Sequence, residues 1–240
     1  MRAFSIACFL TMLSAAAAAG QSAPNPPAST VCRPSFTTAT GSFSAGTAFV
    51  CDYPDAKAQL LVTAQHLFGP MGGLPAAIAW NEMAGNIKKV DASCIDNPAS
   101  HLISSNVVPI EGAHGVDNNG VRDDIAAFAL PGAAGRPALK LATAAPKVGD
   151  PVWLYGCQAG GKQVELIHAV VALSTDQELD YSFTNTTIKL HGTSGAPVLD
   201  AEGNVVALNI GSTMRRGKLV GYGNPVASIR EHLGKALGNK

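Results

Sequence analysis

The chain has 240 residues, of which 47% are hydrophobic, 14% charged and 6% aromatic, so it is long and apolar enough to bury a substantial core. Its 17 Lys and Arg balance its 17 Asp and Glu, which removes the electrostatic case for a nucleic-acid partner or a membrane-surface partner. The same composition excludes an intrinsically disordered protein, because disorder requires low hydrophobicity or a large net charge.

The N-terminus has the pattern of an export signal. Arg2 is followed by an apolar run from Phe4 to Leu13 and by small residues at 15–19. That run is shorter than the about 20 apolar residues that span a bilayer, so no membrane anchor is expected. We therefore predict a signal peptide over 1–20, a flexible Pro- and Ser-rich leader over 21–34, and a mature protein that is secreted or periplasmic.

Export changes how the cysteines are interpreted. Cys32, Cys51, Cys94 and Cys157 form an even set in an oxidising compartment, which predicts two disulfides. Four cysteines allow three pairings, and the sequence does not choose among them. We favour Cys32 with Cys51, because they bracket a segment that reads as two strands joined by a turn near Gly41. A zinc site would need C-x-x-C or His spacing, which is not present, so neither a metal nor another cofactor is expected.

From residue 35 onward, short β-branched and apolar runs alternate with Gly, Pro, Asn and Asp, which is typical of an all-β protein. The predicted strands are Thr47–Cys51, Gln59–Thr63, Ile87–Ala92, Val107–Glu111, Ile125–Leu130, Val152–Gly156, Gln163–Leu173, Ile188–Leu190, Pro197–Asp200, Val205–Ile210 and Lys218–Gly221. The stretch 131–151, rich in Gly, Ala and Pro, separates two halves.

The C-terminus alone has a helical pattern. Asn224 is a good N-cap, and Pro225 suits the first helical turn. Apolar residues then recur at helical spacing, at Val226, Ile229, Leu233 and Leu237. A helix and tail are therefore predicted over 225–240.

Three segments carry side chains suited to nucleophilic chemistry, and their order is informative. The strand LVTAQH ends at His66, Asp124 opens the run DIAAFAL, and Ser194 lies between two glycines in HGTSGAPVLD. A serine hydroxyl is a weak nucleophile at neutral pH and needs a base, which in turn needs a carboxylate to hold its tautomer. The order His, Asp, Ser differs from the Ser, Asp, His order of α/β-hydrolases.

At these residues the sequence resembles the chymotrypsin-like (trypsin-like) serine proteases, and within them the bacterial HtrA-like and glutamyl-endopeptidase-like branches. The matching motifs are G-T-A-F-V at 46–50, T-A-Q-H at 63–66, D-I-A at 124–126 and G-T-S-G-A-P at 192–197. The resemblance extends over 35–237. It implies an all-β fold of two six-stranded antiparallel barrels, at 35–131 and 132–224, with the active site between them and a C-terminal helix.

The resemblance also implies roles for individual residues. His66 would be the general base, Asp124 would orient it, and Ser194 would attack the peptide carbonyl. The neighbouring Asp123 competes for the carboxylate role, but the apolar register of the following residues favours Asp124. The backbone N–H groups of Gly192 and Ser194 would form the oxyanion hole.

One departure from the family pattern lies next to the nucleophile. Digestive members have an acidic residue there that pairs with a freshly cleaved N-terminus, whereas this chain has Thr193. We therefore predict activity that does not depend on a new N-terminus. By the resemblance, Ile188 and Asn209 would line the primary substrate pocket, and His191 would contact substrate. None of these is acidic, so we expect small or apolar side chains at the cleavage site rather than Lys or Arg.

The predicted function is a secreted serine endopeptidase that acts as a monomer on protein or peptide substrates. An esterase of the α/β-hydrolase fold is disfavoured, because a strand follows Ser194 where that fold has a helix. A non-enzymatic binding protein on a protease-like fold is the alternative, although such relatives usually lose the His or Ser that this chain keeps. The segment 117–123 spaces oxygen ligands like a calcium loop, but an ordinary polar turn is the favoured interpretation.

Overall fold

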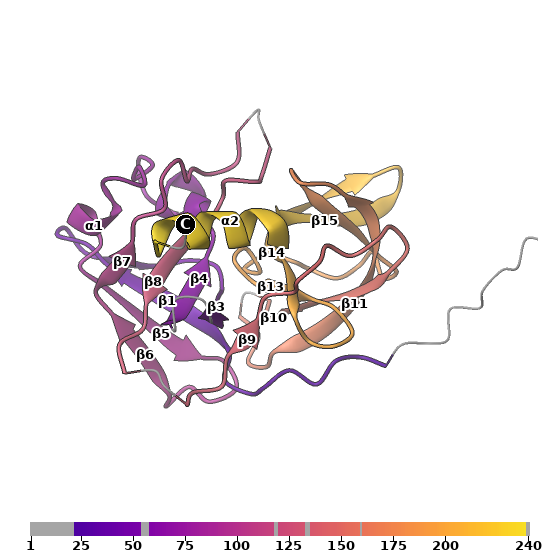
Figure 1. Cartoon of the computed structure of the whole chain (residues 1–240), viewed down its shortest axis with the longest axis horizontal. Coiled ribbons are helices and arrows are strands. Elements are labelled where there is room, and N and C mark those ends of the chain that lie inside the picture. Colours follow the sequence, from indigo (N-terminus) through magenta and orange to yellow (C-terminus); the bar gives the residue numbers. More distant parts are fainter. Residues whose placement is uncertain (1–21, 54–57, 118–119, 133–134, 159, 239–240) are drawn as a thin grey trace, which may run out of the picture.

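The computed structural model describes residues 22–53, 58–117, 120–132, 135–158 and 160–238, which form two β-sheet units lying side by side (Figure 1). The expected signal peptide at 1–20 lies outside the described residues. The chain enters the first unit through β1, which begins at Val31 because alternate side chains from there are buried. The last residues of the expected leader therefore belong to a strand.

The first unit is a sheet whose main path runs β6-β5-β1-β3-β4-β8-β7, with β2 paired to β1 and β9 paired parallel to β3. Its strands are β1 (Val31–Thr37), β2 (Ser42–Ser44), β3 (Ala48–Tyr53), β4 (Ala58–Thr63), β5 (Lys89–Cys94), β6 (His101–Ser104), β7 (Asn106–Val108), β8 (Ala126–Ala129) and β9 (Leu139–Lys140). Three short helical segments follow β4, namely η2 (Gln65–Phe68), η3 (Pro70–Gly72) and α1 (Met83–Asn86).

The second unit is a closed antiparallel barrel with the order β10-β11-β12-β15-β14-β13. Its strands are β10 (Pro151–Gly156), β11 (Glu165–Ser174), β12 (Leu179–Phe183), β13 (Pro197–Leu199), β14 (Val205–Arg215) and β15 (Lys218–Pro225). Helix α2 (Val226–Ala236) leaves this barrel and runs back across the first unit (Figure 1). No helix in the described part of the chain is long and apolar enough to cross a membrane.

The fold class predicted from the sequence, two antiparallel barrels with a C-terminal helix, is confirmed. Several details differ. Ile188–Leu190 is not a strand but leads into a turn. Strands β6, β9 and β12 are not among the predicted ones, and β12 fills the barrel position between β11 and β15. Asn224 does not cap α2, because pairing of β14 with β15 continues through Pro225, which takes the N-cap position. The Asn224 side chain is buried, with no hydrogen-bond partner among the described residues.

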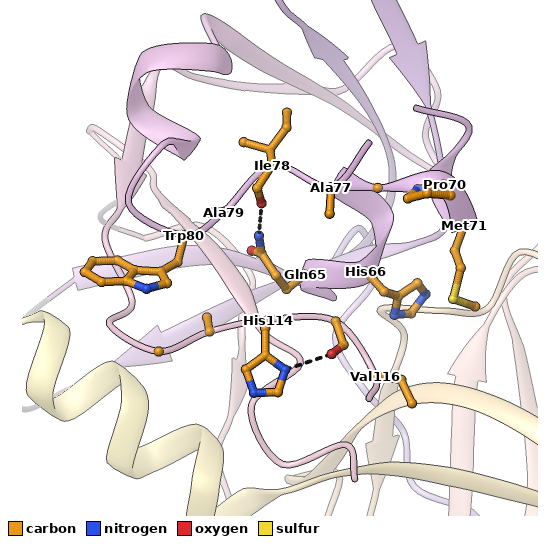
Figure 2. A pocket seen from close by; sticks show the side chains of 14 residues that line it. Gln65, His66, Pro70, Met71, Ala77, Ile78, Ala79, Trp80, His114 and Val116 are labelled. Carbon is orange, nitrogen blue, oxygen red and sulfur yellow. Dashed lines mark hydrogen bonds between the residues drawn. The ribbon is translucent and has the colours of Figure 1, made fainter. Parts of the chain in front are cut away.

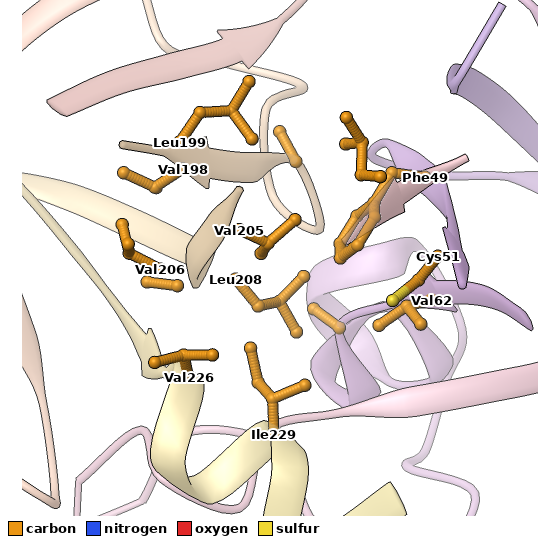
Figure 3. Packing of buried hydrophobic residues seen from close by; sticks show 14 of the residues in the cluster. Phe49, Cys51, Val62, Val198, Leu199, Val205, Val206, Leu208, Val226 and Ile229 are labelled. Atoms are coloured by element: carbon orange, nitrogen blue, oxygen red, sulfur yellow. The ribbon is translucent and has the colours of Figure 1, made fainter. Parts of the chain in front are cut away.

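The two units share a buried apolar layer. On β3, Phe49 points toward the second unit, while the next residue, Val50, points into the core of the first unit. The strand is therefore buried on both faces. Figure 3 shows Phe49 facing the second barrel, where Leu208 and, on α2, Ile229 complete the layer. Strands buried on both faces read as continuous apolar runs rather than alternating ones, as TAFVC does here.

The cysteines correct the expected pairing of Cys32 with Cys51. Cys51 belongs to the shared layer between the units, whereas Cys32 points into the first sheet, so the two thiols lie on opposite faces. Cys32 is instead opposite Cys94 in the β1–β5 ladder, with 3.4 Å between the sulfur atoms of two free thiols. The next pair along, Val31 and Ile95, carries the backbone hydrogen bond, so the cysteines occupy a non-hydrogen-bonded pair.

Candidate active site

The register of two neighbouring strands brings the first two motifs together. β4 and β8 pair antiparallel, with Thr63 opposite Ala126, so the residue that follows β4 and the residue that precedes β8 lie at the same edge of the sheet. His66 lies in η2, just after β4, and Asp124 lies just before β8. A backbone ladder therefore sets the distance between these two side chains.

His66 and Asp124 form two hydrogen bonds in a buried setting. His66 Nδ1 is 2.7 Å from Asp124 Oδ2, and the backbone N–H of His66 donates to Asp124 Oδ1 at 2.9 Å. Only 6% of His66 and 1% of Asp124 is exposed. A carboxylate at Nδ1 selects the tautomer that carries its proton there, which leaves Nε2 able to accept a proton. This is the arrangement of an oriented general base.

The competing carboxylate, Asp123, faces α2 instead of His66. Asp123 Oδ1 is 2.8 Å from His232 Nε2, and Asp123 Oδ2 is 3.6 Å from His114 Nε2. The adjacent Arg122 forms an ion pair with Glu231 of the same helix. These contacts tie the loop before β8 to the C-terminal helix, and they leave Asp124 as the carboxylate that contacts the imidazole.

The loop that carries Ser194 is pressed against the first unit. The backbone N–H of Thr47 donates to the Ser194 carbonyl at 2.8 Å, and Thr47 Oγ1 donates to the Gly192 carbonyl at 2.7 Å. A Cβ placed on Gly46 would lie 2.6 Å from both the Ser194 carbonyl oxygen and Leu67 Cδ1. Since Leu67 directly follows His66, the structure brings the serine and histidine motifs to one place at the junction of the two units.

The Ser194 hydroxyl is not directed at the imidazole. Ser194 Oγ donates to the Ile210 carbonyl at 3.0 Å, and no hydrogen bond among the described residues joins it to His66. Ser194 is partly exposed, so its side chain has room to change rotamer. The base and the carboxylate are therefore already paired, whereas the Ser194 hydroxyl is bonded to a backbone carbonyl.

Two backbone N–H groups near Ser194 have no acceptor in the described chain. Gly192 has φ +87°, a conformation that glycine adopts at little cost, and neither its N–H nor that of Ser194 donates to another described residue. Unpaired N–H groups flanking a serine are the donors that an oxyanion would need. These are the two residues that the sequence resemblance assigned to the oxyanion hole.

The other predicted substrate-binding residues occupy different surroundings. His191 is exposed at the turn before Ser194, and Ile188 is half-buried and packs against the core. Asn209 is 1% exposed, and its amide nitrogen donates to the Thr193 carbonyl at 2.8 Å. The Asn209 side chain is thus already hydrogen-bonded to the nucleophile loop.

A pocket of about 610 Å³ adjoins His66 on the first unit (Figure 2). Its lining includes Met71 on η3, Trp80, and His114 and Val116 from the loop that leads toward Asp124. Met71 is 69% exposed, so this apolar side chain is accessible at the pocket. No sequence motif marked these residues, because they come from loops that only the fold brings together.

No group of three or more His, Cys, Asp or Glu in the described part of the chain is arranged to hold a metal ion. The segment 117–123, compared above with a calcium loop, lies partly outside the described residues.

Comparison with known proteins establishes the class. The model of the trypsin-like peptidase domain matches residues 46–208, which include both the His66–Asp124 pair and Ser194. This match covers more than half of the chain. The chain therefore belongs to the trypsin-like peptidase family, and its class is that of a serine endopeptidase. No curated protein matches the sequence.

Solved serine proteases share the fold at low identity. The active form of the Rv3671c protease from M. tuberculosis matches with a TM-score of 0.57 and 17% identity, over 90% of this chain and 88% of that one. A serine endoprotease from Yersinia pestis matches with a TM-score of 0.59 and 15% identity, over 88% of this chain and 64% of that one. The HtrA-type protease AlgW matches with a TM-score of 0.57 and 17% identity, over 88% and 61%. These identities establish the fold alone, and this chain spans less than two thirds of the last two proteins.

Proposed function

We propose that the chain is an exported serine endopeptidase in which His66, Asp124 and Ser194 are the catalytic residues. The observation that carries this assignment is a buried imidazole, 2.7 Å from a carboxylate, at the junction where the other unit contributes a serine on a glycine-flanked turn. In a site of this composition, the imidazole is the base, the carboxylate fixes its tautomer, and the serine is the nucleophile.

Catalysis by this set begins with a side-chain rotation. Rotation of Ser194 about χ1 exchanges the Ile210 carbonyl for Nε2 of His66, and such rotamer changes are fast compared with turnover. As Ser194 Oγ attacks the peptide carbonyl carbon, His66 accepts the hydroxyl proton. The carbonyl oxygen becomes negative and accepts hydrogen bonds from the N–H groups of Gly192 and Ser194.

Collapse of this intermediate completes the cycle. His66 gives its proton to the departing amine, so the C–N bond breaks and an acyl-enzyme remains on Ser194. Water then attacks the ester with His66 again acting as the base. Asp124 stays ionised throughout and stabilises the imidazolium that forms in both halves of the reaction.

We infer that the substrates are proteins or peptides with a small or apolar side chain at the cleavage site and that the enzyme acts as a monomer. The support is chemical: Ile188 is apolar, and Asn209 and His191, the other predicted pocket residues, carry no negative charge for a Lys or Arg. Hydrolysis of a peptide series that differs only in that side chain tests this, with Ala, Val and Leu expected to be cut fastest. A clear preference for Arg contradicts it.

Covalent labelling distinguishes the peptidase from a non-enzymatic binding protein. A fluorophosphonate reacts with a serine only when a base activates it, so we expect labelling of the wild-type chain and none of Ser194→Ala. The hydrogen bond of the Ser194 hydroxyl to the Ile210 carbonyl, rather than to His66, favours the binding protein. Equal absence of labelling in both proteins, with both folded, supports a binding protein and contradicts catalysis.

Export further predicts a disulfide, and we propose that Cys32 and Cys94 form it. The cross-strand position holds their Cα atoms about 4.5 Å apart, within the range that a disulfide spans. Each thiol loses one proton and one electron as the S–S bond forms, and oxidised glutathione is reduced to two thiols. The hydrogen bond from Cys32 lowers the pKa of the Cys94 thiol to about 7, so its thiolate, the attacking species, is populated near neutral pH.

Alkylation of the denatured protein tests the pairing. Incubation with oxidised glutathione should protect two thiols of the wild type from alkylation until a reductant is added. The protection should disappear in Cys94→Ser and persist in Cys51→Ser, because burial raises the pKa of Cys51 to about 12 and Cys51 has no cysteine opposite it. Protection that disappears in Cys51→Ser instead contradicts the proposal.

A further inference from the structure

Gly192 lies in a turn, and the type of that turn sets the direction of the Gly192 N–H, one of the two proposed oxyanion donors. The turn runs from Leu190 to Thr193 and is closed by the Thr193 N–H, which donates to the Leu190 carbonyl at 3.1 Å. Its third residue, Gly192, has φ +87°, which defines a type II rather than a type I turn. The two types differ by a flip of about 180° of the central peptide, which joins His191 and Gly192. Because the Gly192 N–H belongs to that peptide, the turn type decides which way it points.

Side-chain hydrogen bonds hold the last residue of this turn. Thr193 Oγ1 donates to the Leu190 carbonyl at 2.7 Å, so this carbonyl accepts a second hydrogen bond from Thr193 besides that of the backbone N–H. Asn209 Nδ2 donates both to Thr193 Oγ1 at 3.1 Å and to the Thr193 carbonyl at 2.8 Å. Both residues are 1% exposed, so water does not compete for these bonds. The Asn209 amide therefore fixes Thr193 at the peptide that leads into Ser194.

The backbone of Asn209 is joined to the same loop. Its carbonyl accepts from the Gly195 N–H at 2.8 Å, and its N–H donates to the Ala196 carbonyl at 2.8 Å. These bonds set the position of the Asn209 Cα relative to Ser194 before its side chain makes any contact. The Asn209 side chain thus extends to Thr193 from a backbone whose position is already fixed.

Tyr181 determines which way the amide of Asn209 is turned. An asparagine amide is able to flip and exchange its donor for its acceptor, but the Tyr181 hydroxyl donates to Asn209 Oδ1 and so leaves Nδ2 toward Thr193. Burial raises the pKa of Tyr181 well above its usual value, so the hydroxyl remains a donor. Gly221 makes room for the ring, since a Cβ there would lie 2.3 Å from Tyr181 Cε2.

We propose that Asn209, oriented by Tyr181 and joined to Thr193, is a positioning residue that keeps this turn in its type II form before substrate arrives. The inference rests on the proposed function, and it replaces the expectation that the Asn209 side chain lines the substrate pocket. All three side chains are neutral, so the turn is ordered without the ion pair to a freed N-terminus that an acidic residue at position 193 would require.

Turnover per active site separates positioning from folding. The variants are Asn209→Leu, which keeps the volume without hydrogen bonds, and the pair Thr193→Val and Thr193→Ser, of which only the second keeps the hydroxyl. The active sites of each variant are titrated with a fluorophosphonate, and kcat and KM are then measured on one peptide. The value of kcat is calculated from the concentration of labelled sites. Tyr53→Phe is the control for Tyr181→Phe, because Tyr53 is also buried and its hydroxyl donates to a carbonyl, that of Arg230, away from the turn.

Misdirecting one oxyanion donor should lower kcat about 10- to 100-fold in Asn209→Leu and in Thr193→Val, with KM changed less than about threefold. Thr193→Ser should recover most of the activity, Tyr181→Phe should lose about 3- to 10-fold, and Tyr53→Phe should match the wild type.

Two results would overturn the inference. The first is an unchanged kcat per labelled site in Asn209→Leu and Thr193→Val, which would make the network merely structural. Because Thr193→Val is isosteric, it decides the question if Asn209→Leu fails to fold. The second is a wild-type chain that is not labelled at all, which removes the proposed function and this inference with it. If the wild type is labelled and the variants keep their kcat, the proposed function stands and only this inference fails.

Discussion

The two halves of the candidate site are held in place by different kinds of contact. In the first unit, His66 and Asp124 meet because β4 and β8 are neighbours in one backbone ladder. In the second unit, Ser194 directly follows a turn held by side chains that are distant in sequence, Thr47 and Asn209. A backbone ladder tolerates most side-chain changes, whereas a turn held by single hydrogen bonds depends on each donor. The nucleophile half is therefore the more sensitive to substitutions outside the catalytic set.

The largest expected effect tests the half of the site that the β4–β8 ladder holds, the His66–Asp124 pair. Asp124→Asn keeps the shape of the side chain but allows the wrong histidine tautomer, and the same change in a well-studied triad lowers kcat about 10⁴-fold. We expect a loss of that order here, measured as kcat on a peptide substrate. Asp123→Asn is the matched control and should change kcat less than about twofold, since Asp123 contacts His232 and not His66. A larger loss in Asp123→Asn than in Asp124→Asn contradicts the assignment.

The next effect tests the contact between the halves. A Cβ on Gly195 would lie 2.1 Å from the Thr47 carbonyl and 2.5 Å from Thr63 Oγ1, so Gly195→Ala must push the serine loop off the first unit. A displacement of about 1 Å at a reacting group costs on the order of 100-fold in rate, and we expect at least that loss in kcat/KM.

Gly203→Ala separates this steric effect from backbone strain. Gly203 also has a positive φ, of +83°, but a Cβ there would meet only Pro24 Cβ at 3.7 Å. It should lose about 1 kcal/mol of unfolding free energy, measured by denaturant titration, and keep its activity. Equal activity losses in the two variants would mean that strain alone, and not the contact with Thr47, explains Gly195→Ala.

The same contrast explains what the sequence predicted. Most strands and the order of the motifs follow from local patterns. The pairing of His66 with Asp124 is implied by the family resemblance, since it depends on β4 and β8, which are distant in sequence, being neighbours in the sheet. The resemblance places Asn209 in the substrate pocket from its position on the strand after Ser194, whereas the direction of its amide depends on Tyr181. β12, which carries Tyr181, is missing from the predicted strands because those rest on β-branched and apolar runs, whereas LDYSF alternates apolar and polar residues.

Pairings between distant segments were the other limit. Cys32 lies opposite Cys94 rather than Cys51, because β1 pairs with β5 along nearly its whole length and the alternation of side chains turns Cys51 to the other face. The sequence gives the alternation within each strand but not the partner strand. The pocket beside His66 is a similar case, because Met71 comes from the one-turn helix η3 and Val116 from a loop, and neither segment has a periodic pattern.

A smaller effect tests the cross-unit hydrogen bond to the oxyanion turn. Thr47→Val removes the Oγ1 donor to the Gly192 carbonyl without changing the shape of the side chain. The unpaired buried carbonyl costs about 1–2 kcal/mol, which corresponds to about a tenfold loss in kcat/KM if the cost falls on the active turn. Thr30→Val, which removes a hydroxyl bonded to the Pro27 carbonyl, is the control and should keep wild-type activity. Equal activity in Thr47→Val and wild type would mean that Asn209 alone suffices to hold the turn.

The smallest expected effect concerns the N-terminus. The described part of the leader is tied to the first unit, where Ser29 N–H and Oγ donate to the two oxygens of Asp96. Thr193 is bonded instead to Leu190 and Asn209 and has no charge that a free amino group would pair with. A chain beginning at residue 22 and the same chain with a short Gly-Ser extension should therefore have equal kcat, within about twofold, on one peptide. An extended chain that is inactive until the extension is removed would show that the turn needs a free N-terminus, and that the neutral network around Thr193 does not hold it.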